Sequence, residues 1–216
     1  GSAFTAPASD GMTRPDGDTG SYFMWLDGNG KSYEPGDSVP ADVTELTVQW
    51  TAPTYTVTLN AGNGTINSGN VTEYTYGVGA TLPTADDMTY TGHTFKGWYG
   101  NENLTGSPVT AISNTETGNK EYWAKWEINQ YTIIYDLAGG TVEGNPDTYT
   151  IKAGAFTLKN PTKSGYTFTG WSGTGLDGEN NMTVTIPTGS TGNRTYTAHW
   201  RYNGGGGSSS SPSYPV

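Results

Sequence analysis

The chain has 216 residues and a formal net charge of −10, from 20 acidic and 10 basic side chains. An acidic surface repels phosphate backbones, so nucleic acid is not expected as a partner. The absence of Cys excludes disulfides, thiolate metal ligands and a thiol nucleophile. No apolar run approaches the roughly 18–20 residues that span a membrane, so no membrane insertion is expected within this sequence.

Residues 1–51 are predicted to form a partial or degenerate first repeat unit. Two of its stretches, YFMW at 22–25 and LTVQW at 46–50, recur in altered form twice further along the chain. An opening hairpin is not visible before Ala3. Either the unit is cut at its start or it has lost its first strands, and we favour a cut.

Residues 55–126 are predicted to form the second repeat unit. The stretch YTVTLN at 55–60 alternates apolar and polar side chains, which is the pattern of a strand with one buried face. A turn follows at Asn63-Gly64, and a second strand is expected near 71–76. Pro83 then breaks the chain and leaves room for one short helix before FKGW at 95–98 and a closing strand at 122–126.

Residues 131–200 repeat this pattern and are predicted to form the third unit. The offset is 76 residues from Tyr55 to Tyr131 and 74 residues from Trp126 to Trp200, so only loop-sized insertions separate the copies. Four-residue linkers at 51–54 and 127–130 are too short to be floppy tethers. Residues 201–216 are rich in Gly and Ser, which predicts a flexible linker.

On the stretch PTKSGYTFTGW at 161–171 and the ending AKW at 124–126, the chain resembles the Listeria–Bacteroides repeat family, the internalin B-type B-repeat of bacterial cell-surface proteins. The resemblance implies a mostly β fold of the α+β type, with tandem small β-grasp-like units and at most one short helix in each. It also implies an extracellular, cell-wall-associated location, and it supplies no catalytic residues.

The two histidines are predicted to be structural. His93 stands where the third unit has Tyr166, and His199 stands where the second unit has Lys125. A catalytic or metal-binding His would not exchange so freely, and no unit offers a recognisable Ser-His-Asp set. We therefore expect no enzyme activity, no cofactor and no metal. The acidic loops at 16–20 and 27–31 lack the spacing of a calcium-binding EF-hand and are better explained as turns.

Tryptophan is more informative. Trp98, Trp126, Trp171 and Trp200 recur at two fixed places and are predicted to be core residues. Trp123 differs, because the third unit has Thr at the same place. Strand alternation puts it on the outer face together with Lys125, so Trp123 and Lys125 are candidate ligand contacts.

Two functions are therefore considered for a monomeric chain. In the first, the repeats form a semi-rigid stalk or spacer at the bacterial cell surface. In the alternative, they form an adhesive module that binds an extracellular glycan or host protein through exposed aromatic side chains.

Overall fold

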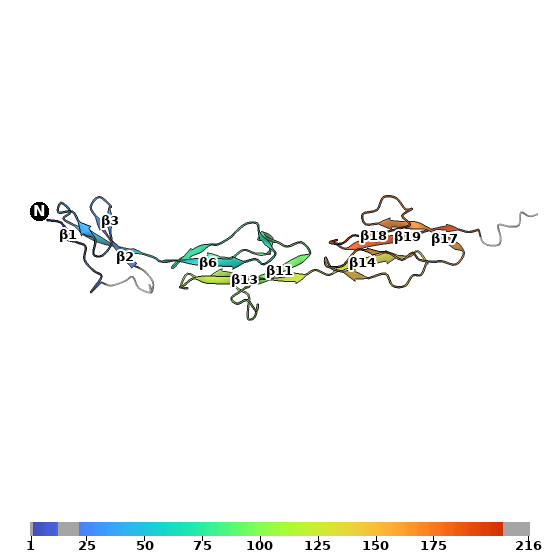
Figure 1. Ribbon diagram of the computed structural model, residues 1–216, viewed down its shortest axis with the longest axis horizontal. Helices are drawn as coiled ribbons and strands as arrows, with labels where there is room; N and C mark the ends of the chain where they lie inside the picture. Colours follow the sequence, from blue (N-terminus) through green and yellow to red (C-terminus); the bar gives the residue numbers. More distant parts are fainter. Residues whose placement is uncertain (1, 13–21, 205–216) are drawn as a thin grey trace, which may run out of the picture. The chain divides into compact units, whose positions relative to one another are not determined.

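The structure is a computed structural model that describes residues 2–12 and 22–204, and nearly all of its regular structure is β-strand (Figure 1). Among the described residues the one helical element is the 3-10 helix η1 (Ala85–Asp87) in the second repeat. The mostly β prediction is thus confirmed, whereas the β-grasp likeness remains a prediction. Contacts group the chain into two compact units, residues 1–89 with 95–126, and residues 90–94 with 127–216.

The second repeat is built on a four-stranded sheet of order β11-β13-β6-β8. Its central strands β6 and β13 run parallel, and β8 pairs antiparallel with β6. Two small antiparallel pairs, β7 with β10 and β9 with β12, close the unit. The strands are β6 (Thr54–Asn60), β7 (Thr65–Ile66), β8 (Glu73–Thr75), β9 (Ala80–Thr81), β10 (Met88–Thr89), β11 (His93–Tyr99), β12 (Ala111–Ile112) and β13 (Lys120–Ile128).

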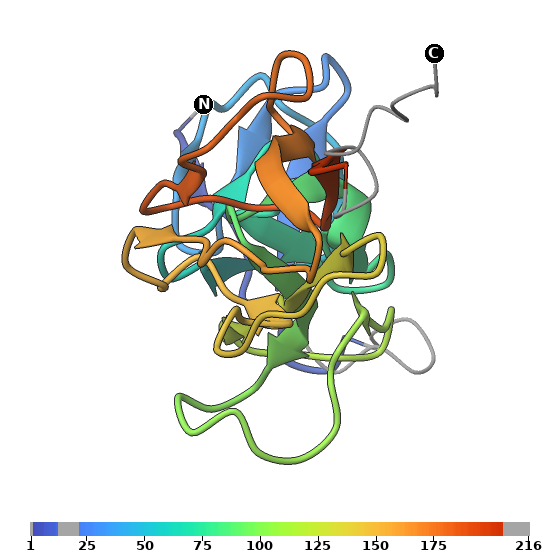
Figure 2. The same cartoon turned by 90° about the vertical axis from the view of Figure 1, so that its right-hand side faces the viewer.

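The third repeat has the same sheet, of order β15-β14-β19-β17, with β14 and β19 parallel at its centre. The pair β16 with β18 corresponds to β9 with β12. The strands are β14 (Tyr131–Asp136), β15 (Thr148–Tyr149), β16 (Phe156–Thr157), β17 (Tyr166–Gly173), β18 (Thr185–Ile186) and β19 (Arg194–Tyr202). In the second repeat the segment after β11 loops away from its sheet (green in Figures 1 and 2).

The first repeat contains the later strands of the same unit. Its sheet has the order β3-β2-β5, and β1 pairs with β4 as β9 pairs with β12. The described residues contain no counterpart of β6 and β8, or of β14 and β15, which we name the opening strand pair. The strands are β1 (Phe4–Thr5), β2 (Tyr22–Asp27), β3 (Ser32–Tyr33), β4 (Ser38–Val39) and β5 (Leu46–Thr51).

Each repeat has its own core, and equivalent positions are buried in all three. One such position comes directly after β1, β9 or β16, the first strand of the small antiparallel pair in each repeat. The residues there are Ala6, Leu82 and Leu158, and they are 2%, 2% and 4% exposed. The cores differ in size: the hydrophobic cluster of the first repeat holds three buried residues, and that of the third repeat holds eight. The division into units at 1–51, 55–126 and 131–200 remains a prediction, and most of the predicted 201–216 linker lies outside the described residues.

The glycine of the Phe-x-Gly-Trp stretch has a structural cause. In the third repeat, the pairing of β17 with β19 shifts between Phe168 and Gly170, which marks a β-bulge. Gly170 has a φ of +140°, and a Cβ there would lie 2.5 Å from the backbone of Asn181. The first repeat pairs β2 with β5 without a shift and has Met24 in this place. The first repeat therefore has neither the β-bulge nor the glycine at this place.

Candidate functional site

A triad of aromatic rings occurs once in each repeat. Phe95 meets Trp98 and Trp126 at centroid distances of 5.3 and 5.4 Å, and Phe168 meets Trp171 and Trp200 at 5.4 and 5.5 Å. The first repeat repeats this geometry with Phe23, Trp25 and Trp50, at 5.7 and 5.6 Å. All six contacts are edge-to-face, an arrangement that aromatic pairs prefer. The shared triad places Phe23, rather than Tyr22, opposite the closing tryptophan.

The triads have structural roles in the second and third repeats. Trp98 is 1% exposed and Trp171 is 0% exposed, as predicted for core residues. Trp126 and Trp200 are only half-buried. Each of the latter two donates its indole N–H to a backbone carbonyl of the turn after the opening strand, Ala61 at 2.9 Å and Leu137 at 3.0 Å. These rings therefore fasten the opening strand pair to the closing strand.

Trp123 and Lys125, the predicted contact residues, both lie on β13. Trp123 is half-buried and stands opposite Asn60 in the parallel pairing with β6. Lys125 is exposed, and its Nζ lies 5.5 Å from the ring centre of Tyr99, which is buried. This geometry brings a cation over an aromatic face, which is a stabilising contact in its own right. A role of Trp123 and Lys125 in binding remains a prediction.

The third repeat places a serine, a histidine and a carboxylate close together, which the sequence did not indicate. Ser172 Oγ lies 2.6 Å from His199 Nε2, and His199 Nδ1 lies 3.7 Å from Glu179 Oε2. The order of groups is that of a nucleophile, a base and an orienting acid. The carboxylate, however, is 69% exposed and beyond hydrogen-bond distance. The second repeat has Tyr99 and Lys125 at the same two positions, so this is an ordinary cross-strand pair site.

The acidic loops have turn chemistry. The carboxylate of Asp27 accepts hydrogen bonds from the backbone of Asn29 at 2.8 Å and Lys31 at 3.0 Å, and from the hydroxyl of Tyr33 at 3.0 Å. Desolvation raises the pKa of Asp27, but these bonds together lower it below its ordinary value. Within the described ranges no group of three His, Asp or Glu side chains could hold a metal ion. The loop at 16–20 lies outside the described residues.

Asp87, the second of two adjacent acidic residues at 86–87, also has a structural role. Its carboxylate accepts a hydrogen bond from Ser68 Oγ at 2.5 Å and one from the backbone N–H of Thr84 at 2.9 Å. The bond from Thr84 caps the N-terminus of η1. The bond from Ser68, followed by that from Thr84, lowers the pKa of Asp87 below its ordinary value.

The family model of the Listeria-Bacteroides repeat domain matches residues 55–125 and again residues 131–199. The chain belongs to the Listeria-Bacteroides repeat family. The resemblance drawn from the motifs is therefore confirmed, and the two matches coincide with the second and third repeats. The first repeat, whose described residues contain no counterpart of the opening strand pair, lies outside both matches.

Two relatives come from Evansella cellulosilytica. One, described as "Putative Gly-rich membrane protein", is 32% identical over 149 residues, 67% of this chain and 16% of that protein. Another, described as "Putative membrane protein", is 32% identical over 139 residues, 62% of this chain and 19% of that protein. The Listeria-Bacteroides repeat chain thus spans less than a fifth of the curated relatives it matches. No solved structure matches it.

A search for membrane-crossing helices among the described residues finds none of sufficient length and apolarity.

Proposed function

We propose that this chain belongs to the extracellular, cell-wall-associated region of a bacterial surface protein and acts there as a semi-rigid stalk or spacer. The family membership and the membrane-protein descriptions of the two relatives support a surface location. The tandem order of the repeats and their acidic, polar surface support a spacer role, because such a surface keeps an exposed stalk soluble.

One observation carries the semi-rigid part of the proposal: a linker residue is held in place by two hydrogen bonds. The backbone N–H of Asn129 donates to the carbonyl of Gly92 at 2.8 Å. Its side-chain Oδ1 accepts from Thr94 Oγ1 at 2.5 Å. A linker residue bound at both its backbone and its side chain has few conformations left, so the chain leaves the repeat in a defined direction.

The same two bonds recur at the end of the third repeat. The backbone N–H of Asn203 donates to Gly165 at 3.0 Å, and its Oδ1 accepts from Thr167 Oγ1 at 2.7 Å. Gly165 and Thr167 occupy the positions of Gly92 and Thr94 in their repeat. The fixed exit is therefore part of the repeat unit and is not an accident of one linker.

Distances between spin labels test the proposal on the full chain. Because the chain has no Cys, Val78→Cys and Met182→Cys add unique attachment sites at exposed positions of the second and third repeats. A semi-rigid stalk gives one narrow distance distribution. Asn129→Gly should broaden it, whereas Asn203→Gly removes equivalent bonds beyond both labels and should leave it unchanged. A broad distribution in the parent chain would contradict the stalk, as would a compact particle in small-angle scattering.

We further propose adhesion as the second candidate function, with an extracellular glycan or host protein as the ligand. The supporting observation is the partly exposed indole of Trp123 beside the exposed Lys125, at a place where the third repeat has Thr197. Aromatic rings at such positions often anchor contacts. Glycan arrays and cell-binding assays with the parent chain and Trp123→Ala decide between the candidates. Equal binding by both would remove Trp123 as a contact.

A further inference from the structure

In the second and third repeats, the loop before the closing strand ends on a basic residue. Residues 113–120, SNTETGNK, lead into β13, and residues 187–194, PTGSTGNR, lead into β19. Both loops have Gly-Asn before the basic residue, and the asparagine side chain accepts a hydrogen bond from a backbone N–H of the opening strand, at 2.9 Å in the second repeat and 3.0 Å in the third. Lys120 and Arg194 therefore occupy the same position in their repeats.

In the second repeat this basic residue has an anionic partner within its own loop. Lys120 Nζ lies 3.2 Å from Glu116 Oε1, and the two side chains are 24% and 37% exposed. The backbone N–H of Ser113 donates a hydrogen bond to the same carboxylate. Desolvation raises the pKa of Glu116, but the bonds from Ser113 and Lys120 together lower it below its ordinary value. A glutamate carboxylate therefore fits beside the basic residue and stays ionised there at neutral pH.

The third repeat keeps the basic residue but not the carboxylate. Ser190 takes the position of Glu116, and its hydroxyl donates to the carbonyl of Pro187 at 2.6 Å. Pro187 in turn takes the position of Ser113 and has no N–H to donate. Within the described ranges no carboxylate forms an ion pair with Arg194. The third repeat thus carries a cation whose counter-charge is not supplied by its own loop.

Two tyrosines hold the guanidinium of Arg194 in place. Arg194 Nε donates to the hydroxyl of Tyr149, and Nη1 donates to that of Tyr196, both at 3.1 Å. Tyr149 is 6% exposed and Tyr196 is 1% exposed, so both rings are fixed in the core. A guanidinium has five N–H donors, so three remain, which is enough for a two-bond contact with a carboxylate. Arg194 itself is only half-buried, so a ligand can reach it from solvent.

We propose that Arg194 is a binding site for a carboxylate, which takes the place that Glu116 occupies in the second repeat. The carboxylate is that of a glutamate or aspartate side chain in a protein partner, because the occupant in the second repeat is itself a glutamate. Removing a guanidinium from water without a counter-charge costs free energy, and a ligand carboxylate offsets that cost. The site belongs to the third repeat, whereas Trp123 and Lys125 belong to the second. The inference therefore goes beyond both proposed functions and can fail or succeed independently of them.

Blocked glutamate, N-acetyl-L-glutamic acid α-amide, is the probe, and the full chain is the receptor. At constant ionic strength the probe should shift the NMR signals of the Arg194 Nε–H and of the amides of residues 190–196. The midpoint should be on the order of 10 mM, as expected for a single charge-assisted contact. Blocked glutamine has the same shape without the charge and should cause no shift.

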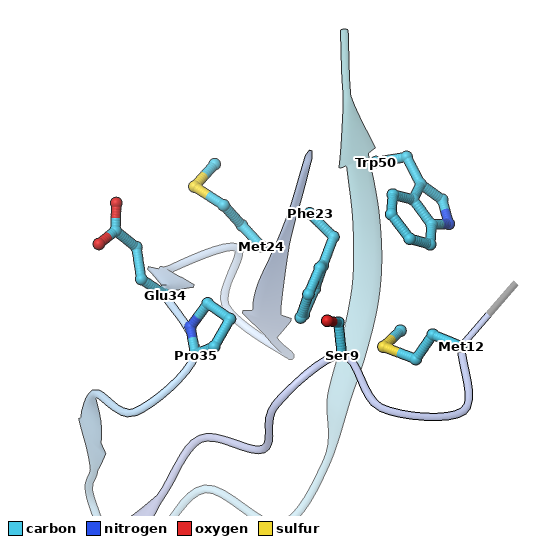
Figure 3. A pocket seen from close by; sticks show the side chains of 7 residues that line it. All are labelled: Ser9, Met12, Phe23, Met24, Glu34, Pro35 and Trp50. Atoms are coloured by element: carbon cyan, nitrogen blue, oxygen red, sulfur yellow. The ribbon is translucent and has the colours of Figure 1, made fainter. Parts of the chain in front are cut away.

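The cavity of the first repeat provides an internal control. It has a volume of about 400 Å³, and Glu34 is the one charged residue among the described residues that line it (Figure 3). Like charges repel, so an anion should not enter this cavity. Shifts at Phe23 and Trp50, which also line it, as large as those at Arg194 would indicate non-specific binding and would count against the proposal.

A matched pair of variants locates the site. Ser190→Glu gives the loop its own carboxylate beside Arg194, as the second repeat has, and should weaken the binding of blocked glutamate by about tenfold or more, because a tethered group has a high effective concentration. Ser190→Gln has the same length without the charge and should bind as the parent chain does. Both variants keep Arg194 and its bonds to the two tyrosines, so they are expected to fold, and their amide spectra check this.

Three further results would overturn the proposal. The first is an absence of shifts at about 100 mM blocked glutamate, or equal shifts from blocked glutamine, because the site would then not recognise the charge. The second is unaltered binding by a folded Ser190→Glu chain. The third is binding of glucuronate at least about tenfold more tightly than blocked glutamate, since the partner would then be an acidic glycan and not a protein.

Discussion

The third and first repeats carry the same aromatic triad, yet the first tryptophan of the triad differs in its exposure to solvent. Trp171 is 0% exposed, whereas Trp25 is half-buried. The side of the core formed by the small strand pair is equally closed in both, because Ile186 is 1% exposed and Val39 is 0% exposed. Contacts within the triad are therefore not enough to bury this tryptophan. The opening strand pair closes the remaining side of the core, and the comparison predicts how much each repeat depends on its triad.

The largest expected effect is that of Trp171→Ala. Removal of a fully buried aromatic ring costs about 3–5 kcal/mol, which is comparable to the whole stability of a domain of this size. The variant should unfold the third repeat. The same change at Trp25 should cost less than about 2 kcal/mol, because that ring already contacts water.

Hydrogen exchange followed by NMR measures the two variants separately in their own repeats. Loss of protection throughout 131–200 in Trp171→Ala, with the second repeat unchanged, is the expected result. An equal loss of stability from the two substitutions would break the comparison, since it would mean that exposure does not decide the cost.

A smaller effect is expected at the contact between turn and closing tryptophan. A Cβ on Gly140 would lie 2.3 Å from the Trp200 ring, and one on Gly64 would lie 2.1 Å from Trp126. Gly140→Ala should therefore cost about 1–3 kcal/mol through overpacking. Gly154→Ala is the matched control in the same repeat, because nothing lies within 4 Å of its added Cβ and its φ is not positive. It should change stability by no more than about 0.5 kcal/mol in urea unfolding.

Alkaline pH should weaken the third repeat through Tyr135. Burial, followed by the nearby charge of Asp147, raises the pKa of Tyr135 to about 12. A phenol whose pKa is higher in the folded state stabilises that state below the unfolded pKa of about 10. This contribution is fully present below pH 10 and is lost as the pH rises from about 10 to about 12.

Tyr135→Phe provides the control for the alkaline transition. It keeps the ring but removes the hydroxyl, which donates to the carbonyl of Pro146 at 2.7 Å. The variant should be less stable at neutral pH and should lose less stability than the parent between pH 10 and 12. Unfolding in urea at several pH values measures both. Parallel pH dependence in the two proteins would show that Tyr135 does not titrate as expected.

Sequence periodicity predicted the strands well where one face is buried. The alternation at 55–60 belongs to β6, and the recurrence of Trp98 and Trp171 identified the two most buried tryptophans among the described residues. Recurrence alone could not separate these from Trp126 and Trp200, which are half-buried because their indoles lie at the rim and bond to a turn. Tryptophans that recur equally in the copies thus have two different roles. One pair fills the core, and the other pair bonds to the turn after the opening strand.

Features that depend on strand register could not be predicted. When the stretch YFMW at 22–25 is written above FKGW at 95–98, Tyr22 stands at the position of Phe95. The pairing of β2 with β5 gives that position to Phe23 instead, because this pairing has no bulge. The contact between Ser172 and His199 likewise joins residues that are two positions apart in the antiparallel pairing of β17 with β19. The sequence pattern does not show the β-bulge, and the bulge decides which residues of β17 and β19 come into contact.

The smallest expected effect is that of Trp123→Thr, which tests whether one repeat tolerates the residue of another repeat outside the core. Trp123 and Thr197 occupy the same place on the closing strands β13 and β19. Trp123 is half-buried, and it stands beside the Asn60 side chain, which bonds to Glu121 and to the carbonyl of Tyr122. Trp123→Thr installs the third repeat's residue, which has a high strand propensity. The change in the free energy of unfolding should be within about 0.5 kcal/mol in urea. A loss of about 2 kcal/mol or more would show that the indole packs as part of the fold, and Trp123 would then be an unsuitable candidate for ligand contact.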